Sequence, residues 1–249
     1  MHKKKYLIVN ADDFGQSPGI NRGIIRAHEH GIVTSASLMT RWEAAAEAAR
    51  YAIDHPQLSV GLHIDLGEWA YRGSNWMPLY SVVASLDDEQ AILKEITEQF
   101  ATFQRLVGRD PSHIDSHQHV HLRQPVRSAV LHIAQTLHIP VRDCNSPAHY
   151  CGRFYGQTAE GAPLRGFISS EALIEILEGL PEGLTEIGCH PAASVDLRTM
   201  YCSERLAELQ VLCDDQIKAR IEALGIELCS FAALPGECCA AELPPIKIY

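Results

Sequence analysis

The sequence lacks the signals of a membrane or secreted protein. No apolar run in its 249 residues approaches the roughly 20 that a helix needs to cross a bilayer. The apolar run at 6–11 is too short for a secretory signal, and no small-residue cleavage site follows it. We interpret the preceding HKKK as a solvated start of the chain. These absences predict a cytoplasmic protein.

Positive charge is also scarce. The chain has 21 Lys and Arg against 31 Asp and Glu, a net charge of -10. A chain of this charge is a poor ligand for phosphate backbones or anionic lipid surfaces. We therefore expect neither nucleic acid nor a membrane as a partner.

Several motifs that define other protein classes are missing. None of the eight cysteines forms a CxxC pair, which excludes the usual zinc and redox patterns and predicts mostly structural, reduced thiols. Cys238 and Cys239 are adjacent, and we expect them to be surface thiols. The sequence contains no GxSxG nucleophile turn and no glycine-rich P-loop. Cys189 precedes His190, but neighbours on a strand face opposite ways, so we do not expect a thiol–imidazole pair.

What is present is a regular alternation of short β-type runs with helical patterns. The predicted strands are 7–11, 33–39, 58–64, 112–117, 139–143, 184–190 and 226–231. The predicted helices are 19–30, 42–53, 86–107, 124–137, 169–178 and 203–223. An irregular stretch follows residue 64, residues 144–168 are predicted to be a long loop, and the proline-containing tail is predicted to be irregular. This order indicates βαβ units and a parallel sheet.

With no repeat or linker, we predict one domain over residues 1–249, of the α/β class. Polar residues cluster at the carboxyl ends of several predicted strands, which favours a TIM-like β/α barrel, irregular and with about seven strands, because those ends meet at one mouth. A doubly wound open sheet is the alternative.

Those strand ends carry potential metal ligands and acid or base groups. The first strand runs into Asp12 and Asp13, and the third ends in GLHID. The fourth is the richest, with a ligand type at every second position: His113, Asp115, His117, His119 and His121. While the chain stays extended, these side chains face the same way. The fifth strand adds Arg142 and the sixth adds His190.

Two imidazoles and one carboxylate with open positions for water make a typical catalytic metal site. The donor set suits Zn²⁺, Mg²⁺, Mn²⁺ or Co²⁺ and does not choose among them. In an adjacent acid pair, one carboxylate can bind the ion while the other stays free as a base.

Five blocks in order carry a resemblance: LIVNADDFG, GINRGIIRAHEHGIVTSASLM, GLHIDL, PSHIDSHQHVHL and GCHPA. Together they resemble the YdjC-like carbohydrate deacetylases of the chitooligosaccharide deacetylase type, over about residues 6–232. The resemblance implies a β/α barrel with a missing or irregular strand. It also implies removal of an acetyl group from an N-acetylated sugar with a divalent metal ion, Mg²⁺ or Zn²⁺, and a homodimer.

Carried over by position, Asp13, His63 and His117 match the metal ligands of the family. Asp12 matches the general base, and His190 is the candidate general acid. From its place at a strand end, Arg142 is predicted to orient Asp12. The family often has three consecutive histidines where this chain has His117, Gln118 and His119, and His121 remains the rival ligand.

Two other functions stay open at this point. One is a metal-dependent hydrolase of another bond, such as a phosphoester, and the other is a non-catalytic sugar-binding or regulatory protein. Four aromatic residues follow the third strand and are candidates for stacking on sugar rings: Trp69, Tyr71, Trp76 and Tyr80.

Overall fold

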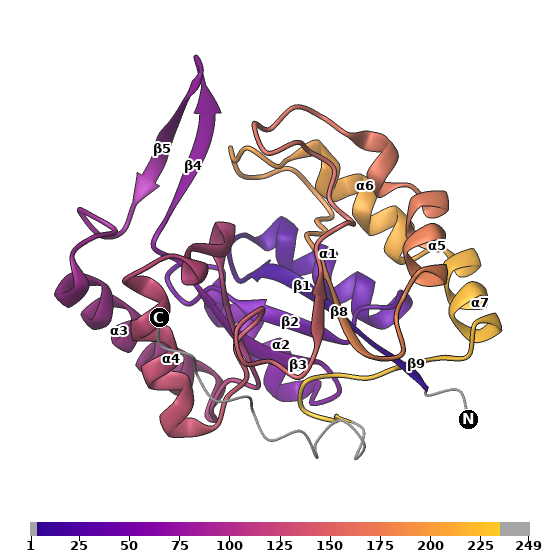
Figure 1. Ribbon diagram of the computed structural model, residues 1–249, viewed down its shortest axis with the longest axis horizontal. Helices are drawn as coiled ribbons and strands as arrows, with labels where there is room; N and C mark the ends of the chain where they lie inside the picture. The colour runs from indigo at the N-terminus through magenta and orange to yellow at the C-terminus, as the bar shows by residue number, and fades with distance from the viewer. Residues whose placement is uncertain (1–3, 235–249) are drawn as a thin grey trace.

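A curled parallel sheet forms the centre of the molecule (Figure 1). The computed structural model describes residues 4–234. Six strands lie in the order β6-β3-β2-β1-β8-β7, and β9 also pairs with β1. Their bounds are β1 Lys5–Phe14, β2 Ser35–Leu38, β3 Ser59–Ile64, β6 Ile114–Ser116, β7 His149–Cys151, β8 Gly183–Cys189 and β9 Ile226–Leu228. Since β1 is buried on both faces, its residues 6–9 form a continuous apolar run.

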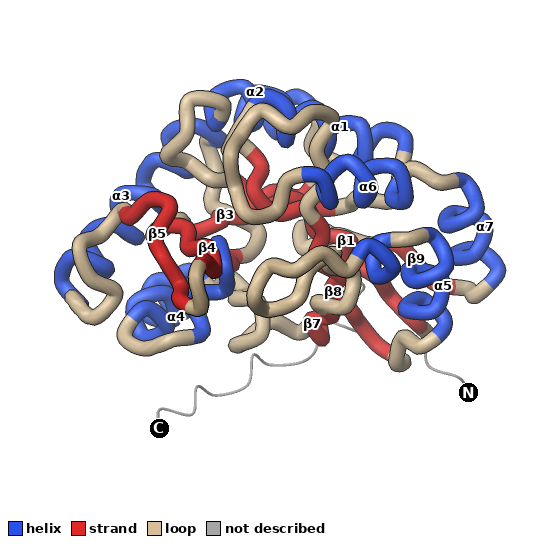
Figure 2. The backbone as a smooth tube through the Cα atoms, turned by 90° about the horizontal axis from the view of Figure 1, so that it is seen from above, coloured by secondary structure: helices blue, strands red, loops and turns tan. Residues whose placement is uncertain are grey.

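Helices cover the outer face of this sheet (Figure 2). They are α1 Pro18–His30, α2 Ala45–Asp54, α3 Glu89–Val107, α4 Val126–Leu137, α5 Ser170–Glu178, α6 Ser203–Leu212 and α7 Asp215–Ala223. Side chains fix the starts of two of them: Ser17 caps α1, and Asp88 caps α3. None of the helices within residues 4–234 is long and apolar enough to span a membrane.

The inner face of the sheet is layered. At the bottom, Tyr6 and Ile8 of β1 pack with Leu184 and Phe231 in a small apolar cluster. Two residues further along β1 the inward positions become polar, and the same change occurs along β8 at Glu186. Alternation along each strand therefore builds an apolar floor, a buried polar middle layer and a top layer at the strand ends.

The sheet closes only part of the way, so the structure is a half-barrel, which agrees with an irregular TIM-like barrel but is not a full barrel. Predicted strand 139–143 is not a strand, because only Val141 bridges to Ile114. Two features end the pairing there. The backbone N–H groups of Asn145 and Ser146 turn back onto the Val141 carbonyl, and Asp143 has a positive φ of 54°.

Other elements differ from the sequence predictions because tertiary contacts decide them. The stretch after residue 64 is an antiparallel hairpin, β4 Gly67–Arg72 and β5 Asn75–Ser81, and β7 lies inside the predicted 144–168 loop together with the 3₁₀ turn η2, Arg165–Ile168. Asp214 caps a new helix and divides the predicted helix 203–223 into α6 and α7. The proline-containing tail, Cys238 and Cys239 lie outside the described residues.

The histidine-rich segment is extended only as far as Ser116. Residues His117–Leu122 form a 3₁₀ segment, η1, in which Gln118 and His119 have positive φ. The expectation that five alternate side chains share one face is therefore wrong beyond Asp115. The chain must turn here because the strand has reached the end of the sheet.

Candidate metal centre and its cleft

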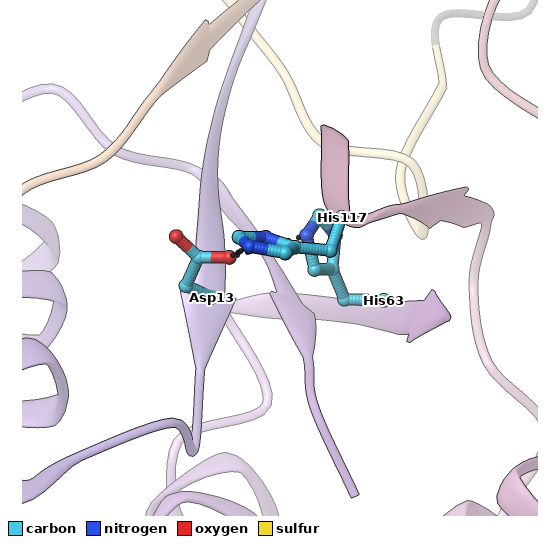
Figure 3. A group of neighbouring side chains, drawn as sticks. All are labelled: Asp13, His63 and His117. Carbon is cyan, nitrogen blue, oxygen red and sulfur yellow. Dashed lines mark hydrogen bonds and ion pairs between the residues drawn. The ribbon is translucent and has the colours of Figure 1, made fainter. Parts of the chain in front are cut away.

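Asp13, His63 and His117 meet at the carboxyl ends of β1, β3 and β6 (Figure 3). Asp13 Oδ1 lies 3.0 Å from His117 Nδ1 and 3.2 Å from His63 Nε2. All three residues are buried, and one potential ligand atom from each lies within 4.8 Å of the others. Two imidazoles and a carboxylate at this spacing fit a divalent ion with positions left for water or substrate.

The backbone at the end of β1 explains how two adjacent acids serve one site. Neighbours on a regular strand point to opposite faces. Asp13 instead has φ 68°, in the left-handed region that Asp tolerates better than most residues. The turn continues through Gly15, where φ is 90° and an added Cβ would lie 2.9 Å from the Met39 carbonyl oxygen. As a result Asp12 and Asp13 both line the same cleft.

A second carboxylate holds His63 in place. The Nδ1–H of His63 donates to Asp115 Oδ1 at 2.7 Å, which leaves Nε2 of His63 directed at Asp13. Burial lowers the pKa of His63, but the charge and hydrogen bond of Asp115 outweigh it and raise the pKa to about 10. An ion that binds Nε2 must displace that proton, so metal binding is expected to release protons and to strengthen as pH rises.

Asp12 is held by Arg142 in a two-bond ion pair. Nη1 donates to Oδ2 and Nη2 to Oδ1, both at 2.7 Å. Burial raises the pKa of Asp12, but the Arg142 guanidinium lowers it below the usual value overall. Arg142 also lies 2.7 Å from Asp115 and from Glu186, so one buried cation serves three carboxylates.

Arg142→Met is therefore expected to destabilise the fold by about 3–5 kcal/mol, because it leaves three buried carboxylates without their cation. Urea unfolding at neutral pH would measure the loss. Burial raises the pKa of Glu186 to about 7, so the loss should shrink as pH falls and that group takes a proton. The matched control is Arg153→Met, whose exposed pair with Glu175 predicts at most about 1 kcal/mol. Equal losses in the two variants would contradict the interpretation.

His190 follows β8 and lies beside Asp12, with Nε2 3.8 Å from Oδ2. Burial lowers the pKa of His190 to about 4, so the ring is neutral at neutral pH. Tyr155 and Tyr201 flank it edge-on, with ring centroids 5.6 and 5.4 Å away. Behind it, Glu208 accepts the backbone N–H of His190 and the hydroxyl of Tyr201.

The sequence analysis does not predict two residues of the site, Arg205 and Glu208, which lie on helix α6. Arg205 Nη2 donates to Asp13 Oδ2 at 2.5 Å. Burial raises the pKa of Asp13, and the charges of Arg205 and His117 more than reverse this, so the pKa falls well below its usual value. Glu208 lies one turn further along α6, and burial raises its pKa to about 8. Charged residues on a helix are usually solvated, and no local signal marks these two as buried.

The remaining histidines of the segment lie outside the cluster of three. His121 uses both ring nitrogens, Nδ1 with Ser116 Oγ at 2.6 Å and Nε2 with the Arg142 carbonyl at 3.0 Å. His119 lines the cleft and packs on Tyr150. His113 lies deeper, stacked on Phe231.

The cluster opens into a cleft of about 1230 Å³. The β4–β5 hairpin, which projects from the body in Figure 1, contributes Trp69 and Trp76 to its lining. Tyr155 and Tyr201 also line it, beside His190. Of the other two predicted aromatics, Tyr71 packs edge-on against Trp76, and Tyr80 donates its hydroxyl to Asp65 at 3.0 Å.

The fold and the cluster together define an α/β half-barrel protein whose strand ends carry an Asp/His group able to hold a metal ion. Residues 6–223 match the family model described as YdjC-like protein. The chain belongs to the YdjC-like family.

Named relatives agree with this membership. The chain is 35% identical to the chitooligosaccharide deacetylase of Serratia marcescens, over 93% of this chain and 100% of the relative. It is 34% identical to the carbohydrate deacetylase of Geobacillus stearothermophilus, over 91% and 97%. Among solved structures it is similar to an Enterococcus faecalis V583 protein named for cellobiose-phosphate cleavage, with a TM-score of 0.74, 26% identity, and 93% and 100% of the two chains covered.

Proposed function

We propose that this chain is a divalent-metal-dependent carbohydrate deacetylase that hydrolyses the acetyl amide of an N-acetylated sugar such as a chitooligosaccharide. One observation carries the proposal: a cluster of two histidines and one aspartate shares a cleft with an arginine-held carboxylate and a histidine. Family membership and the names of the relatives support the substrate class.

Asp13, His63 and His117 are the proposed ligands, and Mg²⁺ and Zn²⁺ are the proposed ions. When bound, such an ion supplies Lewis acidity, which lowers the pKa of a water molecule and polarises a carbonyl oxygen. The described residues fit this role because their donor atoms are already gathered and the second nitrogen of His63 is held by Asp115.

Asp12 is the proposed general base. Its depressed pKa keeps it ionised at neutral pH, and Arg142 binds both of its oxygens and so holds the carboxylate in place in the lining of the cleft. A base that is already ionised and oriented can take a proton from the attacking water without first losing one of its own. We assign Arg142 to positioning of Asp12, since it is fully buried beneath it.

His190 is the proposed general acid, because an amine leaves poorly unless it is protonated. The ring is neutral before the reaction, so its proton must arrive during turnover. Asp12 Oδ2 is 3.8 Å from Nε2, which gives the proton taken from water a short route to the ring and from there to the leaving nitrogen. The products are acetate and a free amino sugar.

Purified protein is expected to release acetate from N-acetylglucosamine oligomers, to stop when a chelator removes the ion, and to recover when Mg²⁺ or Zn²⁺ is restored. Elemental analysis before chelation identifies the bound ion. Phosphate release from phosphorylated sugars, measured in parallel, tests hydrolysis of the other bond. Absence of acetate from every acetylated sugar with metal present would refute the proposal.

A further inference from the structure

The base of the β4–β5 hairpin is attached directly to the histidine segment. The Gln118 side chain makes two hydrogen bonds to the backbone of Trp69. Its Oε1 accepts the Trp69 N–H at 2.9 Å, and its Nε2 donates to the Trp69 carbonyl at 2.8 Å. Gln118 follows His117, so the hairpin is held one residue away from a candidate metal ligand.

On the preceding hairpin residue, a buried carboxylate faces that ligand. Glu68 is 4% exposed, and its Oε2 lies 3.7 Å from His117 Nε2. Its other oxygen, Oε1, accepts the backbone N–H of Met200 at 3.2 Å. A carboxylate this deeply buried is costly unless polar partners hold it.

The His117 ring lies between the cluster and Glu68. Its Nδ1 is 3.0 Å from Asp13 Oδ1, on the side where the potential ligand atoms gather. Its Nε2 is buried and has no hydrogen-bond partner within residues 4–234, and Glu68 is the carboxylate beside it. The two ring nitrogens therefore divide between an ion on one side and a carboxylate on the other.

We propose that Glu68 is a positioning residue that orients His117 for the metal ion and thereby couples the β4–β5 hairpin to metal binding. A carboxylate beside Nε2 favours the tautomer with the proton on Nε2, in which Nδ1 carries the free lone pair. Partners of this kind commonly contribute about 10- to 100-fold to metal affinity. The inference rests on the metal site of the proposed function and adds the hairpin to it.

The coupling has a consequence for the cleft. Asp65 already fixes the hairpin base from the other side, because its Oδ1 accepts both the Tyr80 hydroxyl and the Gly67 N–H at 3.0 Å. Glu68 and Gln118 complete the attachment, while the tip around Trp76 and Met77 stays about half exposed. Since linkage is reciprocal, an ion that draws His117 into place should also fix the cleft wall that carries Trp69.

The test is a Zn²⁺ titration of metal-free protein against a chromophoric chelator. Glu68→Gln keeps the shape of the side chain and removes its charge. It is expected to weaken Zn²⁺ binding by about 10- to 100-fold while one ion still binds per chain. Trp76→Ala is the matched control, since it alters the hairpin tip and leaves Glu68 in place, and its affinity should equal that of the wild type.

A second measurement is the amide hydrogen exchange of residues 67–81 with and without Zn²⁺. If Glu68 had only a structural role, its substitution would not change the effect of Zn²⁺ on this exchange. Zn²⁺ should increase protection of the hairpin in the wild type and not in Glu68→Gln at saturating metal. Unchanged affinity in Glu68→Gln would overturn the inference, and so would complete loss of binding, which would make Glu68 a ligand. Neither measurement depends on acetate release, so failure here and failure of the proposed function are separable.

Discussion

Asp12→Asn is expected to bind a divalent ion as tightly as the wild type and to release acetate about 10²- to 10⁴-fold more slowly. The substitution keeps the size of the side chain and removes its ability to take a proton. Asp12 lies outside the cluster of Asp13, His63 and His117, and its oxygens are bound by Arg142. Turnover should fall in kcat, because the proposed role of Asp12 is to take a proton from the reacting water.

Metal affinity and steady-state kinetics on the same preparation test this result. His121→Asn is a suitable control, because that ring lies outside the cluster and both of its nitrogens are already bonded within the fold. If Asp12→Asn turns over at the wild-type rate with metal bound, Asp12 is not the base. If it loses the ion as well, its carboxylate belongs to the ligand set.

Asp13→Ala is expected to lose more than about 100-fold in metal affinity. Loss of a residue that only supports a metal ligand costs up to about 100-fold, and loss of a ligand itself should cost more. Activity should fall with it unless excess ion is supplied. The substitution removes the carboxylate that His63, His117 and Arg205 share.

A companion variant separates ligand loss from folding. Ala at position 13 must adopt φ 68° and leaves Arg205 without this partner, whereas Asn tolerates that conformation and offers a weaker oxygen ligand. Asp13→Asn should therefore fold normally in circular dichroism and still bind the ion poorly. Should Asp12→Asn and Asp13→Asn behave alike in both metal affinity and turnover, the division of labour between the acids is wrong even though the family assignment stands.

The sequence predicts the site residues that lie on strands, because short apolar runs that end in polar residues can be recognised locally. Asp12, His63 and His190 end buried apolar runs, and parallel strands that end at one edge bring such residues together. Within residues 4–234, six strands form the path of the sheet and β9 pairs with β1 beside it, and β7 takes the place of the expected strand at 139–143. Arg142 reaches Asp12 all the same, from an irregular segment that bridges to β6 at a single residue.

The rest of the site depends on packing that no short stretch of sequence encodes. Arg205 and Glu208 become buried only when α6 packs against α1 and η2 and these two side chains reach Asp13 and His190. Glu68 becomes buried only when the hairpin folds back over His117. Barrel closure is decided in the same way, because it depends on how far the edge strands β6 and β7 can approach each other. Each of these features depends on contacts between residues far apart in the sequence, and the spacing of residues within one segment does not predict such contacts.

The left-handed turn at Asp13 has a mechanical consequence. Because the proposed base and the proposed ligand are consecutive residues, their Cα atoms are about 3.8 Å apart across a single trans peptide, whatever the surrounding elements do. Arg142 binds the Asp12 side chain, and Arg205 binds the Asp13 side chain. Breathing of an open half-barrel can widen the cleft or shift the hairpin, but it moves the two carboxylates together. Covalent geometry thus limits how far the proposed base and the proposed ligand can move apart in an open half-barrel.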